Sequence, residues 1–179
     1  MIPNGAVVRT AVASSVGSVV LTSNGDALTS IAFDGAAGPG AMESCVAPDA
    51  VTRTAIEWLR AYFAGDRPRI QDVPLQPEGT EFQQCVWQAL RQIPYGTTRS
   101  YGSIAAEVAH VLGKERMAAQ AIGGAVGRNP LPIIVPCHRV VGTRGKLTGY
   151  AGGLGRKVAL LQLEGVDVGR FSDAPPSHS

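Results

Sequence analysis

Short runs of apolar residues occur in the first part of the chain, as is typical of strands in a sheet. Two runs rich in β-branched residues, residues 7–12 and 16–21, precede a third at residues 27–33. Asn24 and Gly25 separate the second run from the third, as a hairpin turn would. We therefore expect two or three antiparallel strands, followed by an irregular stretch over residues 35–48.

Five later stretches are predicted to be helices, and all but the fourth place apolar residues at the spacing of one helix face. The predicted helices span residues 50–64, 81–92, 100–112, 115–126 and 154–164. Asp49 can cap the first of them, and Thr80 with Gln83 has the form of a capping box for the second. Gly113 separates the third from the fourth, so this pair has the plan of a helix-turn-helix, although such a plan alone is more often simple packing than DNA binding.

These elements predict an α+β fold in two parts. Residues 1–76 form an N-terminal α/β scaffold domain, a small antiparallel sheet with a helix, in which no chemical constellation is visible. Residues 77–170 form a mainly helical C-terminal domain with a winged-helix-like helix-turn-helix, reached through a proline-rich linker. Residues 171–179 are polar and proline-rich, and we expect them to be disordered.

Composition narrows the function classes. The 179 residues are 45% hydrophobic with a formal net charge of +2, as in an ordinary globular protein. No run of about 18 apolar residues and no signal-peptide pattern is visible, so no membrane association is expected. Three cysteines make no disulfide framework and favour the cytoplasm. Residues 77–179 carry eleven basic against seven acidic residues, a weak footprint for a polyanion.

The densest apolar stretch, residues 130–141, contains three prolines and a Cys-His-Arg triplet. Its apolar character indicates burial, and the prolines exclude a central strand. We expect a rigid, buried, mostly extended segment that presents Cys137 in a fixed place. His138 beside it suggests an activated thiol, although an isolated Cys-His pair is more often structural.

The fourth predicted helix is built from unusually small residues. Gly123 and Gly124 in its interior each cost about 1 kcal/mol relative to alanine. Such a cost is tolerated where another backbone must approach closely. The partner is either a neighbouring helix or the groove of a nucleic acid.

Residues 133–141, Ile-Ile-Val-Pro-Cys-His-Arg-Val-Val, resemble the active-site signature of the O6-alkylguanine-DNA alkyltransferases, also called methylated-DNA–protein-cysteine methyltransferases. The likeness extends over about residues 78–166, where several separate motifs match the family in order. The N-terminal part is similar only in its size and in its plan of strands followed by a helix.

The resemblance implies a DNA repair enzyme that moves the alkyl group of O6-alkylguanine in double-stranded DNA irreversibly to Cys137, once per molecule. His138 would act as general base through a water, Glu164 would orient the imidazole, and Asn129 would tie down the turn. Tyr101 would offer its hydroxyl to the departing guanine. The implied base pocket consists of Tyr101, Pro132, Val140, Tyr150 and Ala151.

The resemblance also implies that the helix-turn-helix enters the minor groove and that the target base is flipped out of the duplex. The implied DNA-binding residues are Ser100, Ala118, Ala119, Gln120, Ala121, Gly123 and Arg128. Gln120 stands where the family usually has arginine, so weaker or slower action on duplex DNA is expected, with Arg116 and Arg128 as candidates to compensate. Ala151 lacks a hydroxyl that some relatives have there, and the break around residues 109–114 is longer than usual. No cofactor or metal is expected, and the protein is predicted to be a monomer.

Two other function classes remain open. A non-enzymatic DNA-binding regulator of winged-helix type would have no use for Cys137, His138 and Glu164 together. A cysteine hydrolase would use them, but it would turn over repeatedly, whereas an alkyltransferase is consumed by its reaction.

Overall fold

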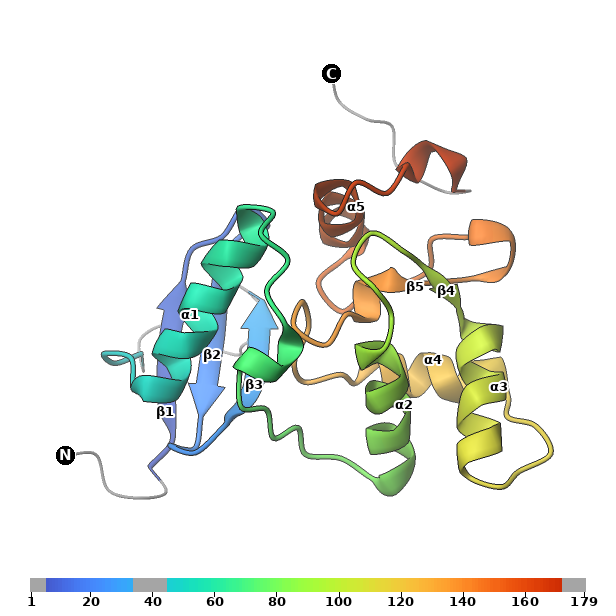
Figure 1. Cartoon of the computed structure of the whole chain (residues 1–179), viewed down its shortest axis with the longest axis horizontal. Helices are drawn as coiled ribbons and strands as arrows, with labels where there is room; N and C mark the ends of the chain where they lie inside the picture. Colours follow the sequence, from blue (N-terminus) through green and yellow to red (C-terminus); the bar gives the residue numbers. More distant parts are fainter. Residues whose placement is uncertain (1–5, 34–44, 172–179) are drawn as a thin grey trace. The chain divides into compact units, whose positions relative to one another are not determined.

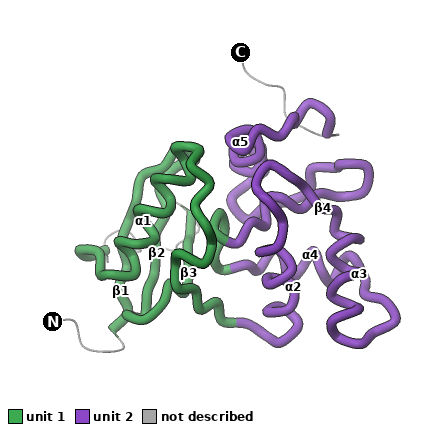
Figure 2. Tube along the Cα trace, viewed as in Figure 1, with its two compact units in different colours: residues 1–78, 130–134 green, residues 79–129, 135–179 purple. Residues whose placement is uncertain are grey.

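The computed structural model describes residues 6–33 and 45–171. The chain forms two compact units, one of residues 1–78 and 130–134 and the other of residues 79–129 and 135–179 (Figure 2). Within the described ranges, no helix has the length and apolar character needed to cross a membrane. The α+β class predicted from the sequence is confirmed.

The first unit contains a three-stranded antiparallel sheet in the order β1-β2-β3 (Figure 1). Its strands are β1 (Val8–Val12), β2 (Val19–Ser23) and β3 (Leu28–Phe33), so all three predicted runs form strands. Gly25 adopts a φ of +93° in the turn between β2 and β3, a conformation that favours glycine. The irregular stretch predicted for residues 35–48 falls mostly on residues 34–44, which lie outside the described ranges.

Helix α1 (Ala50–Phe63) covers one face of this sheet (Figure 1). Asp49 caps it as predicted, since its side chain accepts from the N–H of Thr52 at 2.7 Å. Trp58 and Tyr62 are buried on the inner side, with stacked rings whose centroids lie 5.4 Å apart. The large apolar residues on the inner side of α1 therefore contribute to the core of the first unit.

The described part of the second unit contains four α-helices, namely α2 (Glu81–Arg91), α3 (Tyr101–Val111), α4 (Ala119–Gly127) and α5 (Leu154–Leu163). The capping box of Thr80 and Gln83 is present at the start of α2. Trp87 on α2 is buried, and its Nε1 donates to the carbonyl of Ala125 on α4 at 2.9 Å. Short 3-10 turns complete the described elements: η1 (Ile70–Asp72), η2 (Cys137–Arg139), η3 (Thr143–Gly145) and η4 (Val168–Arg170).

Two parts of the second unit differ from the prediction. Helix α4 begins at Ala119 rather than near residue 115, because Lys114, Glu115 and Arg116 are exposed and offer the helix no apolar face to bury. Phe171 is buried in an apolar cluster instead of belonging to a disordered tail, and residues 172–179 lie outside the described ranges.

The segment before Cys137 is buried, as expected, but it is not extended. Residues 130–135 form turns and bends, and Ile133 has a φ of 74°, which a β-branched residue rarely adopts. The N–H of Ile31 on β3 donates to the carbonyl of Pro130 at 2.8 Å, so the segment is also tied to the sheet of the first unit. Burial and these bonds hold a conformation that residue preferences alone would not select.

A short parallel pairing places the start of α3 beside the end of the Cys137 turn. Strand β4 (Arg99–Ser100) pairs with β5 (Val140–Val141), with Arg99 opposite Val140 and Ser100 opposite Val141. Tyr101, the first residue of α3, directly follows β4. Residues about forty positions apart in sequence therefore meet at one site.

Candidate active site

Cys137 begins the η2 turn, and its backbone is fixed by Asn129. The N–H of Cys137 donates to the carbonyl of Val135 at 2.8 Å, and Nδ2 of Asn129 donates to the same carbonyl at 2.8 Å. The cysteine is only 4% exposed. A reaction partner can therefore reach its sulfur only by entering the protein.

A single buried carboxylate organises the next residues. Oε1 of Glu164, at the end of α5, lies 2.7 Å from Nε2 of His138 and accepts from Nη2 of Arg139 at 2.9 Å. Its Oε2 accepts from Nε of Arg139 at 2.9 Å and from the N–H of Gly96 at 3.1 Å. Nη1 of Arg139 donates to the carbonyl of Ile93 at 2.6 Å. The buried charge of Glu164 is thus compensated by a two-bond ion pair with arginine, the arrangement that makes such burial tolerable.

These contacts determine which atom of the imidazole is basic. Burial lowers the pKa of His138, and its hydrogen bond with Glu164 only partly opposes that effect. Burial would raise the pKa of Glu164, but hydrogen bonds from His138 and Arg139 outweigh it and hold that pKa well below its usual range. An ionised carboxylate only accepts hydrogen bonds, so Nε2 of the neutral ring carries its proton and Nδ1 carries the lone pair.

The thiol itself is protonated at rest. Burial raises the pKa of Cys137, while hydrogen bonding from the side chains of Asn129 and Tyr150 and the positive charge of Lys157 lower it only in part. A base must therefore remove the proton before the sulfur can attack. Of the His138 ring nitrogens, Nδ1 is the one with a lone pair that can accept a proton.

Lys157 is a functional candidate that sequence reasoning missed. This residue of α5 is fully buried, and its Nζ donates to the carbonyls of Val140 at 2.5 Å and Thr148 at 3.2 Å. Burial lowers the pKa of Lys157 to about 8, opposed by its interaction with Cys137. The available signal was a lysine within the apolar stripe of a predicted helix, where a charged side chain is rarely buried without partners. Arg139 was missed as well, although it stands in the quoted signature.

The structure distributes the five predicted pocket residues unevenly. Tyr150 and Tyr101 both interact with the Cys137 thiol: the side chain of Tyr150 lowers the pKa of Cys137, and Tyr101 lies within electrostatic range of the same sulfur. Val140 is buried, with its carbonyl bonded to Lys157, whereas Ala151 is exposed next to Tyr150. Pro132 is buried within the segment that belongs to the first unit.

Most of the predicted DNA-binding residues lie on the outside of α4 and its cap. The exposed ones are Ala118, Ala119, Gln120, Ala121 and Arg128. Gly123 is half-buried, and a Cβ there would lie 3.9 Å from the ring of Tyr101, so α4 runs directly past a candidate pocket residue. Ser100 instead caps α3, with its Oγ accepting from the N–H of Ser103 at 3.1 Å.

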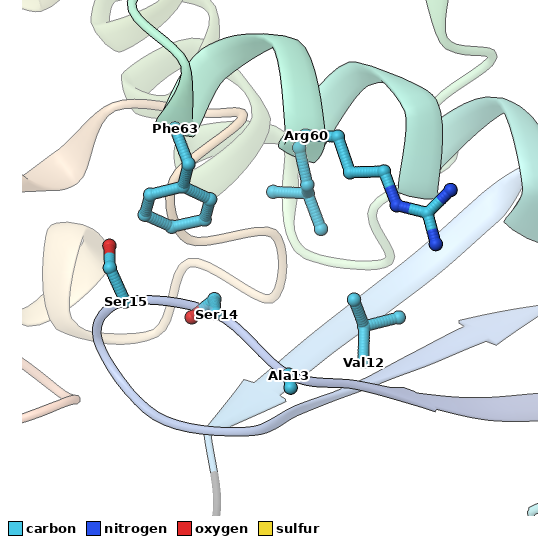
Figure 3. A pocket seen from close by; sticks show the side chains of 7 residues that line it. Val12, Ala13, Ser14, Ser15, Arg60 and Phe63 are labelled. Carbon is cyan, nitrogen blue, oxygen red and sulfur yellow. The ribbon is translucent and has the colours of Figure 1, made fainter.

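A separate pocket in the first unit offers no comparable chemistry. It lies between the β1–β2 connection and the C-terminal part of α1, with a volume of about 380 Å³ (Figure 3). Its lining side chains are Val12, Ala13, Ser14, Ser15, Leu59, Arg60 and Phe63. None of these is a carboxylate, histidine or cysteine. In the described ranges no cluster of three or more His, Cys, Asp or Glu is arranged to hold a metal ion.

Fold and site together define a class of protein. In this class one unit contains both a helix-turn-helix and a buried thiol, here Cys137, next to an imidazole, His138, that is bound by a carboxylate, Glu164. Residues 81–166 match the family described as 6-O-methylguanine DNA methyltransferase, DNA binding domain. The methylated-DNA–protein-cysteine methyltransferase of Methanosarcina acetivorans is 53% identical over 69% of this chain and 75% of its own length. The chain belongs to the methylated-DNA–protein-cysteine methyltransferase family.

Solved structures agree over nearly the whole chain. The crystal structure of Mycobacterium tuberculosis O6-methylguanine methyltransferase superposes with a TM-score of 0.77 at 44% identity, covering 96% of this chain and 97% of that one. The structure of Mycobacterium tuberculosis OGT in complex with DNA gives a TM-score of 0.74 at 42% identity, covering 92% and 95%. The first unit, which resembled the family only in plan at the sequence level, is therefore part of the shared fold.

Proposed function

We propose that this chain repairs DNA by transferring the alkyl group of O6-alkylguanine to the sulfur of its own Cys137. The observation that carries the proposal is the buried Cys-His-Glu arrangement, in which Glu164 fixes the imidazole of His138 at 2.7 Å. The names of the relatives and the structure of one of them with DNA support the same activity. A nucleophilic thiol, a base and a group that orients the base are what such a transfer requires.

The reaction begins with the thiol proton. Nδ1 of His138 takes it through a water, and the sulfur of Cys137 attacks the alkyl carbon. A sulfur–carbon bond forms as the bond between that carbon and guanine O6 breaks. The electron pair leaves with the guanine, which takes a proton from the hydroxyl of Tyr101. Glu164 stabilises the imidazolium that results, because its charge and hydrogen bond favour the protonated ring.

The product is a thioether on Cys137. Neither His138 nor Glu164 has a means of hydrolysing a sulfur–alkyl bond, because that bond lacks the carbonyl group of an acyl-enzyme. Each molecule is therefore consumed in one reaction. This separates an alkyltransferase from a cysteine hydrolase that uses similar side chains.

The burial of Cys137 supports base flipping. A sulfur that is 4% exposed cannot touch a base that is stacked within a duplex, so the guanine has to leave the stack, at a cost of a few kcal/mol. The exposed small residues of α4, among them Ala119 and Ala121, allow the helix to approach a narrow groove. Its contacts are directed to the backbone and to groove shape, with little sequence readout.

A titration tests the proposal. Increasing amounts of duplex DNA with radiolabelled O6-methylguanine are added to a fixed amount of protein, and the label on protein is counted. Transfer should stop at one methyl group per molecule. Cys137→Ser should take up none, while Cys85→Ser, at a partly buried cysteine on α2, should keep the full amount.

Other outcomes identify the other classes. Binding of the DNA without any label on protein would indicate a non-enzymatic regulator. Release of more methyl groups than there are protein molecules would indicate a hydrolase. The cytoplasmic location and monomeric state expected from the sequence stay predictions.

A further inference from the structure

Thr148 contacts three parts of the candidate site at once. Its Oγ1 lies 3.3 Å from the hydroxyl of Tyr101, and its carbonyl accepts from Nζ of Lys157 at 3.2 Å. Its methyl group packs near Gly142, where an added Cβ would lie 3.4 Å from Cγ2 of Thr148. The bond from Lys157 fixes the backbone of Thr148, and the neighbours of its hydroxyl and methyl groups restrict the rotation of its side chain.

The hydroxyl of Tyr101 can use its single proton in only one direction. A phenol donates one hydrogen bond and accepts others. If Tyr101 donated to Thr148, its proton would be occupied when the alkyl group is transferred. If Thr148 donates, the phenol accepts that bond, and its own proton stays available for the departing guanine.

The donor geometry of Thr148 toward Tyr101 and the electrostatics of the phenol favour the second arrangement. Burial raises the pKa of Tyr101, which makes the phenol a poorer acid, and the hydrogen bond with Thr148 opposes this effect. A donor to the phenol oxygen would stabilise the negative charge that develops there as the proton leaves.

We propose that Thr148 is a positioning residue for alkyl transfer, whose hydroxyl donates to Tyr101 and thereby directs the phenolic proton to the guanine. This inference rests on the proposed function of the site. In the reaction, the sulfur–carbon bond forms, the carbon–O6 bond breaks, and the O–H proton of Tyr101 passes to the guanine. Thr148 stabilises the phenolate until it takes a proton from solvent, while the thiol proton is released from His138.

Thr148→Val tests the inference, because valine keeps the shape of threonine and lacks the hydroxyl. Single-turnover transfer from O6-methylguanine DNA should slow by roughly tenfold to a hundredfold, a fraction of what a general acid supplies. Thr148→Ser keeps the hydroxyl and should therefore retain most of the wild-type rate. In a Tyr101→Phe background, Thr148→Val should cause no further loss, because the group it acts through is gone.

Iodomethane provides the matched control reaction. It methylates the same sulfur, but its leaving group is iodide, which needs no proton. Methylation of the Cys137 peptide by iodomethane should therefore proceed at the same rate in wild type and Thr148→Val. Spectroscopic titration, with Tyr101→Phe as the reference that identifies the signal, should show a higher pKa for Tyr101 in Thr148→Val.

The failures can be told apart. If wild-type protein takes no methyl group from the DNA, the proposed function is wrong. If wild type and Thr148→Val take the methyl group from DNA equally fast, Thr148 does not act through Tyr101. The same conclusion follows if Thr148→Val slows methylation by iodomethane as much as it slows transfer from DNA. Additional slowing by Thr148→Val in the Tyr101→Phe background would also overturn the inference.

Discussion

Nε2 of His138 lies 2.7 Å from Oε1 of Glu164, and neither side chain is exposed. The carboxylate also binds Arg139 through two parallel hydrogen bonds. One residue at the end of α5 therefore orients the base and neutralises the arginine beside it. This double role predicts that a change at Glu164 affects both reaction rate and stability.

Glu164→Gln removes the negative charge while nearly keeping the shape. Arg139 is then a buried cation without its ionic partner, so the free energy of unfolding should fall by about 3–5 kcal/mol. Methyl transfer should slow by roughly a hundredfold or more, because the imidazole loses its orientation and charge stabilisation. Urea unfolding and single-turnover kinetics measure the two effects.

The control for this change is Glu107→Gln. Glu107 pairs with Arg99 at 2.5 Å, but both side chains are partly exposed, so the loss should be at most about 1 kcal/mol with the reaction rate retained. Equal losses from Glu164→Gln and Glu107→Gln would show that the buried carboxylate has no special role.

The burial of Lys157 should make the stability of the protein depend on pH. Burial lowers the pKa of Lys157 from the ordinary 10.5 to about 8 in the folded protein. Between these two pH values the unfolded chain binds the extra proton, so stability rises with pH in this window. The cost of burying the charge is fully present below about pH 8 and is relieved above it, by roughly 3 kcal/mol in total.

Lys157→Met should abolish this rise of the unfolding free energy with pH. The difference in unfolding free energy between wild type and variant should therefore change across the same pH window. Lys114→Met, at an exposed lysine, should leave the rise in place. Parallel stability curves for wild type and Lys157→Met would contradict the burial of a charged lysine here. Transfer at neutral pH should slow in Lys157→Met, because the cation near the thiolate is lost.

Gly123→Ala separates folding from DNA binding. A Cβ at this position would make only ordinary contact with Tyr101, at 3.9 Å, and alanine favours helix by about 1 kcal/mol. The variant should be more stable in thermal unfolding. Under the proposed docking of α4 in the minor groove, its affinity for duplex DNA should nevertheless fall. The control is Gly127→Ala, whose added Cβ has nothing within 4 Å, and it should keep the wild-type affinity. Equal affinities of wild type, Gly123→Ala and Gly127→Ala for duplex DNA would mean that the DNA does not bind at this face of α4.

Gln120→Arg should strengthen action on duplex DNA. Gln120 is exposed in the first turn of α4. Under the proposed docking of this helix on DNA, an arginine there would add a phosphate contact. Repair of duplex should become faster, and the slope of log affinity against log salt should steepen by about one. Gln162→Arg places the same charge on an exposed position of α5 and should change neither quantity. An unchanged duplex repair rate in Gln120→Arg would mean that the glutamine imposes no limit.

The sequence predicts those elements whose signals are local. The runs rich in β-branched residues form β1 to β3, and the caps at Asp49 and Thr80 begin α1 and α2. These structures depend on side chains that satisfy backbone groups a few residues away, so their signals are short and readable.

The sequence is less informative where packing between distant residues determines the local conformation. The turns before Cys137 depend on burial and on a bond from Ile31, and α4 starts late because residues 114–116 have no apolar face to bury. Lys157 is buried because two carbonyls and the Cys137 sulfur converge on it, and none of these is close to it in sequence. The candidate site could be predicted through family resemblance, but the partners that tune it required the fold.

The most direct test of the central claim is the mass of the peptide that contains Cys137 after incubation with duplex DNA carrying O6-methylguanine. We predict that this peptide gains the mass of one methyl group in place of a hydrogen, that peptides with Cys45 and Cys85 gain nothing, and that the DNA is left with guanine. An unmodified Cys137 peptide, or a methyl group on another residue, would contradict the account.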